Sequence, residues 1–225
     1  KIIYFWCKEE YGLEKLPHKD IVELPCIESY GQLANKTFSS VRWVYENYDF
    51  EYFLKFDDNK KFYEPEKFFE VMERDAADYV ITNANPCSYR TFIKWFNKKR
   101  IKVSPKYFDP RILYSAWKPY AVSKRFAEII TKNGNKYATM YVKHLGGCED
   151  HMIGKIFSDF NAGNTSPEIG KSPSRLARIY SRQKRKHIKK GDVVKLTLSK
   201  LGRYKAKKDH PGLHQPGTVH ANNRS

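Results

Sequence analysis

Short apolar runs alternate with longer segments of helical periodicity through the first 165 residues, and this alternation restricts the fold more than any other feature. The strand-like runs are 1–7, 20–24, 51–56 and 78–84, and the helical patterns are 30–48, 65–74, 119–133 and 148–160. Strands that alternate with helices predict an α/β fold, in which helices flank a layered, mostly parallel sheet. Ligands of such sheets bind beyond the carboxyl ends of the strands.

Positive charge is concentrated in the last quarter of the chain. The whole chain has a net charge of +17, but residues 166–225 contain 16 Lys and Arg against three Asp and Glu, while residues 1–165 contain 26 against 22. The high isoelectric point is therefore no argument that the whole protein binds nucleic acid. We expect three parts: an α/β domain at 1–160, a basic linker at 161–190, and at 191–225 either the start of a small β domain or a disordered tail.

Four cysteines lie far apart and form no CxxC pair, which argues against a structural zinc site. Buried thiols and one or two disulfides both remain open. No run of about 18 apolar residues is present, so we expect no transmembrane segment within this chain.

Asp57, Asp58 and Asn59 follow the apolar run 51–56 directly. Carboxylate oxygens suit hard cations such as Mg²⁺ or Mn²⁺, which in turn neutralise phosphates. Asp-rich turns also occur as Asx turns and helix caps. The residues alone favour a metal–nucleotide site and a polar turn equally.

Two further groups of residues are candidates for a functional site. Glu149 and Asp150 begin the helical segment 148–160, where acids are favoured by capping and the helix dipole, and where a general base would be held at the edge of a cleft. Trp117 and Tyr120 belong to an aromatic stretch, and aromatic rings pack either on sugars or in a protein core. For both groups, the residues alone favour the structural interpretation.

The order of four segments adds information that no single segment carries. The first segment, ESYGQLANKTFSSVRWVYENYDFEYFLKFDDN, is similar to the pattern D-S-Y-x-N-L-T-x-K-T … W … K-x-D-D-D. The second, SYRTFIKWF, is similar to R … K-W. The third and fourth, KPYAVSK and CEDHMIG, are similar to G-Y-V-x-S and E-D-V-x-x-G. Together they resemble the β-1,3-galactosyltransferase family, inverting glycosyltransferases that include the Fringe-like enzymes. The resemblance covers about residues 1–160 and implies a GT-A fold, which is Rossmann-like.

On the donor side, the resemblance implies that Lys55, Asp57 and Asp58 bind a UDP-sugar. Asp58 and Asn59 would be ligands of Mn²⁺ or Mg²⁺ at its diphosphate. On the acceptor side, Asp150 would be the catalytic base, with Glu149, Trp117 and Tyr120 nearby.

The implied reaction moves a hexose from a UDP-sugar to a hydroxyl of a glycan or glycoprotein with inversion. The hexose would be galactose or N-acetylglucosamine, and the linkage β-1,3. For a eukaryotic chain the resemblance implies the Golgi lumen and a membrane-anchored protein. A viral or microbial chain would work in the cytoplasm.

Two alternatives remain open, one from departures from the family pattern and one from the charge of the basic tail. Asn59 replaces the third Asp, Trp117–Pro119 replaces glycines, and the N-terminal R … R … T-W segment has no counterpart, so the domain at 1–160 would be N-terminally incomplete. One alternative is a weak or inactive family member that binds nucleotide or glycan. The other is that basic residues 171–208 bind nucleic acid or an anionic surface, with the α/β domain as a passenger.

Overall fold

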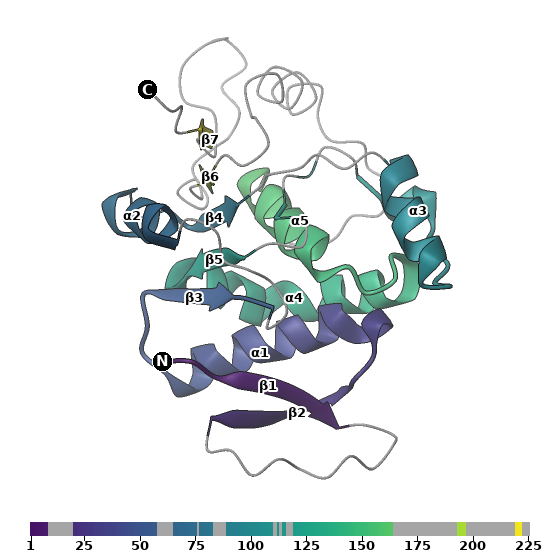
Figure 1. Cartoon of the computed structure of the whole chain (residues 1–225), viewed down its shortest axis with the longest axis horizontal. Helices are drawn as coiled ribbons and strands as arrows, with labels where there is room; N and C mark the ends of the chain where they lie inside the picture. The colour runs from purple at the N-terminus through teal and green to yellow at the C-terminus, as the bar shows by residue number, and fades with distance from the viewer. Residues whose placement is uncertain are drawn as a thin grey trace.

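The structure is a computed structural model in which the elements are mixed α/β (Figure 1). It describes residues 1–8, 20–57, 65–75, 77–82, 89–109, 112, 114–115, 119–163, 193–196 and 219–221. Within these residues, no helix is long and apolar enough to cross a membrane.

The strands form two sheets. The first is a parallel pair of β1 (Tyr4–Lys8) and β2 (Ile21–Ile27). The second has the order β3-β5-β4-β6-β7, and all of its pairs are antiparallel. Its strands are β3 (Tyr52–Lys55), β4 (Tyr79–Thr82), β5 (Tyr120–Ser123), β6 (Val193–Leu196) and β7 (Val219–Ala221).

The prediction of a mostly parallel sheet is not confirmed by the described strands, although the α/β class is. The reason is β5, which lies between β3 and β4 and runs antiparallel to both. β3 and β4 therefore run in the same direction, as the strand–helix–strand pattern through α2 (Pro65–Asp75) predicts. The sequence pattern does not indicate that β5, a strand from later in the chain, pairs between them.

The helix predicted at 119–133 is wrong in its first part. Tyr120–Ser123 is strand β5, and α4 (Lys124–His144) begins only after it. The Ser123 side chain accepts a hydrogen bond from the Phe126 backbone N–H at 3.1 Å, which caps the helix at this point. Tyr120 and Val122 are completely buried, because they belong to the large core that β5 shares with α1, α4 and α5.

The other predicted helices are confirmed within a few residues, and one helix was not predicted. α1 and α5 match the predicted segments, with a short 3-10 turn, η1, in front of α1. The unpredicted helix is α3, within the stretch rich in aromatic residues and Lys. The bounds are η1 (Tyr30–Gln32), α1 (Leu33–Asn47), α3 (Tyr89–Lys98), the 3-10 turn η2 (Pro105–Tyr107) and α5 (Glu149–Asn161).

Two cores cover the two faces of strands β3, β4 and β5. Tyr79, Ile81 and Tyr120 belong to the large core with α1, α4 and α5, whereas Val80 and Ala121 belong to a smaller core under α2. This alternation is the period of two that a strand imposes on its side chains. Strands β4 and β5 are therefore covered on both faces, and this packing holds Tyr79 and Tyr120, the first residues of the two strands, in place.

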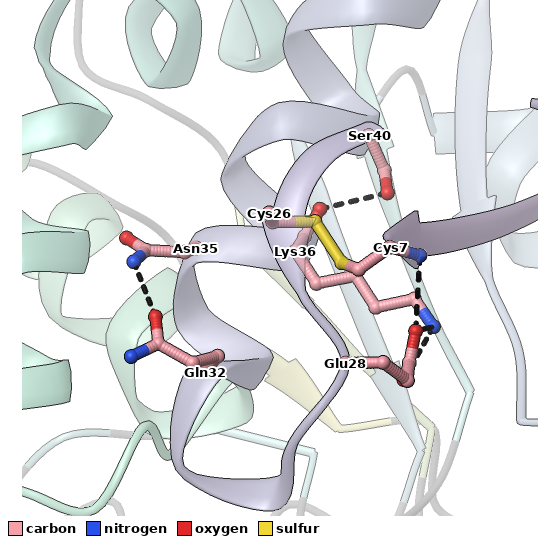
Figure 2. The surroundings of a disulfide bond; sticks show 7 residues. All are labelled: Cys7, Cys26, Glu28, Gln32, Asn35, Lys36 and Ser40. Carbon is pink, nitrogen blue, oxygen red and sulfur yellow. Dashed lines mark hydrogen bonds and ion pairs between the residues drawn. A yellow bond between two sulfur atoms is a disulfide. The ribbon is translucent and has the colours of Figure 1, made fainter. Parts of the chain in front are cut away.

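A disulfide joins β1 to β2 through Cys7 and Cys26 (Figure 2). The strand register shifts between Cys7 and Lys8, because the pairs Cys7–Leu24 and Lys8–Ile27 leave two extra residues in β2, one of which is Cys26. Figure 2 also shows Glu28, which accepts hydrogen bonds from the Cys7 backbone N–H at 3.0 Å and from Lys36 Nζ at 2.7 Å. These contacts tie the parallel pair to α1.

The basic tail is described only at its two strands. β6 pairs with β4 and β7 pairs with β6, so these residues extend the same sheet. The remainder of 164–225, including most of the basic segment 171–208, lies outside the described residues. The domain boundaries at 160 and 190 therefore stay predictions.

Candidate active site at the start of helix α5

A glycine pair fixes the entry into α5. Gly146 and Gly147 have φ angles of 61° and 72°, in the left-handed region that glycine adopts without strain. A Cβ on Gly146 would lie 2.5 Å from Phe96 of α3, and one on Gly147 would lie 2.1 Å from the carbonyl oxygen of Gly31 in η1. The start of α5 is therefore held tightly between α3 and η1, and with it Glu149 and Asp150.

Lys55 brings the end of β3 to the start of α5. Its Nζ donates to Glu149 Oε1 at 3.1 Å and also forms an ion pair with Asp57. Burial lowers the pKa of Lys55, but the charges of Glu149, Asp150 and Asp57 outweigh burial and raise the pKa above its ordinary value. One protonated lysine therefore lies among three carboxylates that come from two segments about 90 residues apart in the sequence.

Two buried tyrosines lie close to the same carboxylates. Tyr79 of β4 and Tyr120 of β5 are completely buried, and their ring centroids are 6.0 Å apart. Burial raises the pKa of both hydroxyls, and the negative charge of Asp150 raises it further. The Tyr120 hydroxyl has no hydrogen-bond partner among the residues that the structure describes. A buried polar group without a partner is rare in a folded protein, and a site for ligand is one explanation.

Tyr30 and Trp95 form a hydrogen-bonded pair near the start of α5. The Trp95 indole N–H donates to the Tyr30 hydroxyl at 2.5 Å, and the Tyr30 ring packs edge-on against Phe96. Burial raises the pKa of Tyr30 to about 12; the Trp95 hydrogen bond opposes this rise, and the charges of Glu149 and Asp150 add to it. Both residues fall on positions of the family pattern, yet sequence analysis gave neither a role in the site.

The structure brings together five of the eight predicted site residues. These are Lys55, Asp57, Tyr120, Glu149 and Asp150. The other three, Asp58, Asn59 and Trp117, lie outside the described residues, so their predicted roles stay predictions. Tyr79 was not predicted. Tyr79 begins strand β4, and Tyr120 begins the neighbouring strand β5. Because only the order of strands in the sheet shows that they are neighbours, the sequence alone does not indicate Tyr79.

The residues present fit a divalent cation by donor type. Asp57 and Glu149 supply the hard carboxylate oxygens that Mg²⁺ and Mn²⁺ prefer. Within the described ranges, no group of three His, Cys, Asp or Glu side chains could hold a metal ion. A metal at this turn would therefore take ligands from outside the described residues, and the family resemblance implies Asp58 and Asn59.

His151, the next residue of α5, belongs to the core. Its Nε2 lies 2.9 Å from the Asp109 carbonyl oxygen, which can only accept, so Nε2 is the donor and Nδ1 accepts from the Tyr141 hydroxyl at 2.5 Å. Burial lowers the pKa of His151 to about 4. The imidazole is thus neutral at pH 7, with both nitrogens occupied.

Comparison with known proteins adds one match. A family model described as galactosyltransferase matches residues 10–168, which includes every element from β2 to α5. No curated protein and no solved structure matches the chain.

Proposed function

The chain belongs to the galactosyltransferase family, and from that premise we propose that it transfers a hexose from a UDP-sugar to a hydroxyl group of a glycan acceptor. Family membership supports a glycosyltransferase, with a sugar donor and an acceptor as partners. The finer parts of the proposal are the donor, galactose or N-acetylglucosamine, the β-1,3 linkage, and inversion at the anomeric carbon.

One observation carries the proposal. Asp150 is buried at the first turn of a rigid helix, and its charge acts on Lys55 of β3, Tyr79 of β4 and Tyr120 of β5. A structural acid at a helix start requires none of these neighbours. An acid that takes a proton from a substrate benefits from being held by several elements at once, because precise placement supplies much of the rate gain.

In the proposed reaction, the Asp150 carboxylate takes the proton of the acceptor hydroxyl. The acceptor oxygen then forms a bond to the anomeric carbon from the face opposite UDP, and the bond from that carbon to the diphosphate oxygen breaks. UDP leaves with the electron pair of that bond. Lys55, whose pKa is raised, stays protonated and offsets part of the negative charge around Asp150 and Asp57.

The GT-A fold implied by the family would place the Asp57–Asn59 turn at the diphosphate of the donor. A Mn²⁺ or Mg²⁺ ion bound there, with Asp58 and Asn59 as ligands, would neutralise charge on the leaving diphosphate. Trp117, Tyr120 and Glu149 would lie on the acceptor side.

A weak or inactive family member is the second candidate. Asn59 supports it, because a neutral amide oxygen binds a divalent ion more weakly than a carboxylate. Such a protein would bind UDP or glycan without turnover. The experiment below separates the two candidates, because it measures binding before transfer.

We propose an oxidising compartment such as the Golgi lumen. The Cys7–Cys26 disulfide supports this proposal, since cytosolic reductants keep most thiols reduced. Alkylation of the natively expressed protein without reductant, followed by mass spectrometry, should leave both cysteines unmodified. Full alkylation of both would favour the cytoplasm.

The test is isothermal titration of UDP into the purified chain, with and without Mn²⁺. We expect binding that depends on Mn²⁺ and is lost in Asp57→Ala and in Asp58→Ala. The matched control is Asp49→Ala, because Asp49 is an exposed acid that pairs with Lys124 on the surface. Absence of UDP binding under both conditions would contradict the active-transferase proposal.

A donor screen then follows UDP release in the presence of glycan acceptors. Turnover with UDP-galactose or UDP-N-acetylglucosamine would identify the donor. UDP binding without turnover for any donor would favour the inactive alternative.

A further inference from the structure

The segment of α3 and the residues directly after it contain positive charges and no negative ones. Between Asp78 and Asp109 the sequence contains seven Lys and Arg and no Asp or Glu. Six of these side chains are exposed, and we call them the basic surface: Lys94, Lys98, Lys99, Arg100, Lys102 and Lys106. In the described part of the chain, none of the six forms an ion pair with a carboxylate.

This basic surface is built on a rigid base. Phe92 and Phe96 anchor α3 in the large core. After the helix, the backbone N–H groups of Lys99 and Ile101 both donate to the Phe96 carbonyl oxygen, at 2.9 and 3.1 Å. The backbone that carries the positive side chains is therefore held in place, and Lys94 and Lys98 lie one helical turn apart on the same face of α3.

Arg100 occupies a position that would suit glycine. Its φ angle is 56°, and among the described residues it is the only one other than glycine with a positive φ. A side chain in this left-handed conformation is disfavoured relative to glycine, which commonly ends helices in this way. The chain therefore holds a guanidinium here at a conformational cost, which points to a use for the charge.

The basic surface begins at the edge of the candidate active site. Lys99 Nζ lies 5.3 Å from the centre of the Tyr30 ring and 5.8 Å from that of Trp95. Tyr30 in turn experiences the charges of Glu149 and Asp150. At the other end, the Tyr107 ring, next to Lys106, stacks on the His144 ring of α4 with the centroids 3.9 Å apart. The basic surface and the candidate active site therefore adjoin each other at Tyr30 and Trp95.

We propose that the basic surface binds the anionic groups of an acidic glycan acceptor, one that carries carboxylate or sulfate groups along its chain. The proposal rests on the proposed function, because it names the acceptor class for the same site. Lys and Arg pair with carboxylate and sulfate groups through charge-assisted hydrogen bonds. The Tyr30 and Trp95 rings lie beside Lys99, and aromatic rings of this kind offer a face on which the C–H groups of a sugar can pack.

The test measures binding of three hexasaccharides to the full chain: chondroitin sulfate, unsulfated chondroitin, and neutral chitohexaose. We expect affinity to fall in that order and to weaken with added salt. The variant Lys94→Gln/Lys98→Gln/Lys102→Gln should lose about tenfold or more in affinity for chondroitin sulfate. The control Lys67→Gln/Lys132→Gln/Lys136→Gln removes the same charge from α2 and α4 and should change affinity less than about twofold.

The basic tail remains in both variants, so its contribution cancels in the comparison. Equal losses in the two variants would overturn the proposal, as would equal affinity for all three hexasaccharides. Tighter binding of a duplex DNA of equal charge, with no hydrogen-exchange protection of residues 89–107, would assign polyanion binding to nucleic acid and would also overturn it. UDP titration of the same variants should be unchanged, which separates failure here from failure of the proposed function.

Arg100→Gly gives an independent check. It should stabilise the fold, because glycine relieves the left-handed strain, and weaken chondroitin sulfate binding about threefold or more. A purely structural role for Arg100 predicts higher stability with unchanged binding, and that result would contradict its place in the basic surface.

Discussion

At each end of α5 a lysine lies beside one or more buried acids, but the described contacts differ between the two ends. At the C-terminal end, Lys155 pairs with Asp159, which also accepts a hydrogen bond from the Tyr137 hydroxyl at 3.0 Å. At the N-terminal end, Lys55 faces Asp57, Glu149 and Asp150. The Tyr137 hydroxyl has its acceptor, whereas that of Tyr120 has none among the described residues.

This difference separates a structural ion pair from a candidate site. At the C-terminal end, one lysine pairs with one carboxylate, which also accepts a hydrogen bond. At the N-terminal end, one lysine pairs with two carboxylates from different segments, and the charge of Asp150 acts on that lysine as well. A divalent ion, or a proton taken from a substrate, would offset negative charge at this second group of acids.

The largest expected effect concerns catalysis at the two ends. Asp150→Asn keeps the size of the side chain but removes its capacity to take a proton, so UDP release in the presence of donor and acceptor should fall by about 10²- to 10⁴-fold. The matched variant Asp159→Asn should retain activity within about threefold, because that acid has a structural partner. Similar rates for the two variants would remove the distinction between the ends.

The second effect concerns stability. Lys55→Met leaves Asp57 and Glu149 without the lysine that pairs with both, and it should lower the free energy of unfolding by about 3–5 kcal/mol, as urea denaturation would show. Lys155→Met should lower it by about 1–2 kcal/mol, because Asp159 takes up a proton and keeps its contact with Tyr137. Lys55→Arg should restore most of the loss. Equal losses for both Met variants would show that the two lysines stabilise the acids around them to the same extent.

A pH effect of similar size arises from His151, the residue that follows Asp150. Its pKa is about 4 in the folded protein against 6.5 unfolded, so the unfolded state binds the proton more readily. The stabilising contribution is therefore complete above pH 6.5 and is lost as pH falls toward 4, by about 3 kcal/mol in total. Unfolding free energies measured from pH 7.5 to 4 should show this loss, and His151→Gln should flatten it. An unchanged slope in that variant would assign the loss to the carboxylates.

The smallest effect concerns two tyrosine hydroxyls. Tyr137→Phe removes a hydrogen bond to Asp159 and should cost about 1 kcal/mol. Tyr120→Phe removes a buried hydroxyl that has no described partner, so thermal unfolding should show no loss of stability. If Tyr120 serves the acceptor side as proposed, this variant should nonetheless raise KM for the acceptor. A loss of stability as large as that of Tyr137→Phe would show that Tyr120 has a structural partner.

The sequence predicted most elements because their signals are local. The apolar runs that became β1 to β4 and the periodicity of α1, α2 and α5 require no knowledge of the rest of the chain. Strand β5 was missed because Tyr120–Ser123 continues directly into a helical pattern. Only its pairing with β3 and β4, about 70 and 40 residues earlier, makes it a strand.

The candidate site was predicted in part for the same reason. Asp57 and Asp150 stand out locally, as an acid after a strand and an acid at a helix start. Their connection through Lys55 depends on the loop at Gly146–Gly147 packing against Phe96 and Gly31, a contact between distant segments. The pairing of Cys7 with Cys26 likewise depends on the register shift in β2, which no spacing of cysteines reveals.

Photoaffinity labelling with 5-azido-UDP-glucose reports directly where the nucleotide lies. The measurement is mass-spectrometric mapping of labelled peptides, with excess UDP as competitor. We expect UDP-competed label on the peptide that contains residues 55–59 or on the one that contains 149–150. Competed label confined to 155–163 or to the basic segment 171–208 would contradict the proposed site, because the nucleotide would then bind away from the start of α5, where Lys55 lies among the acids.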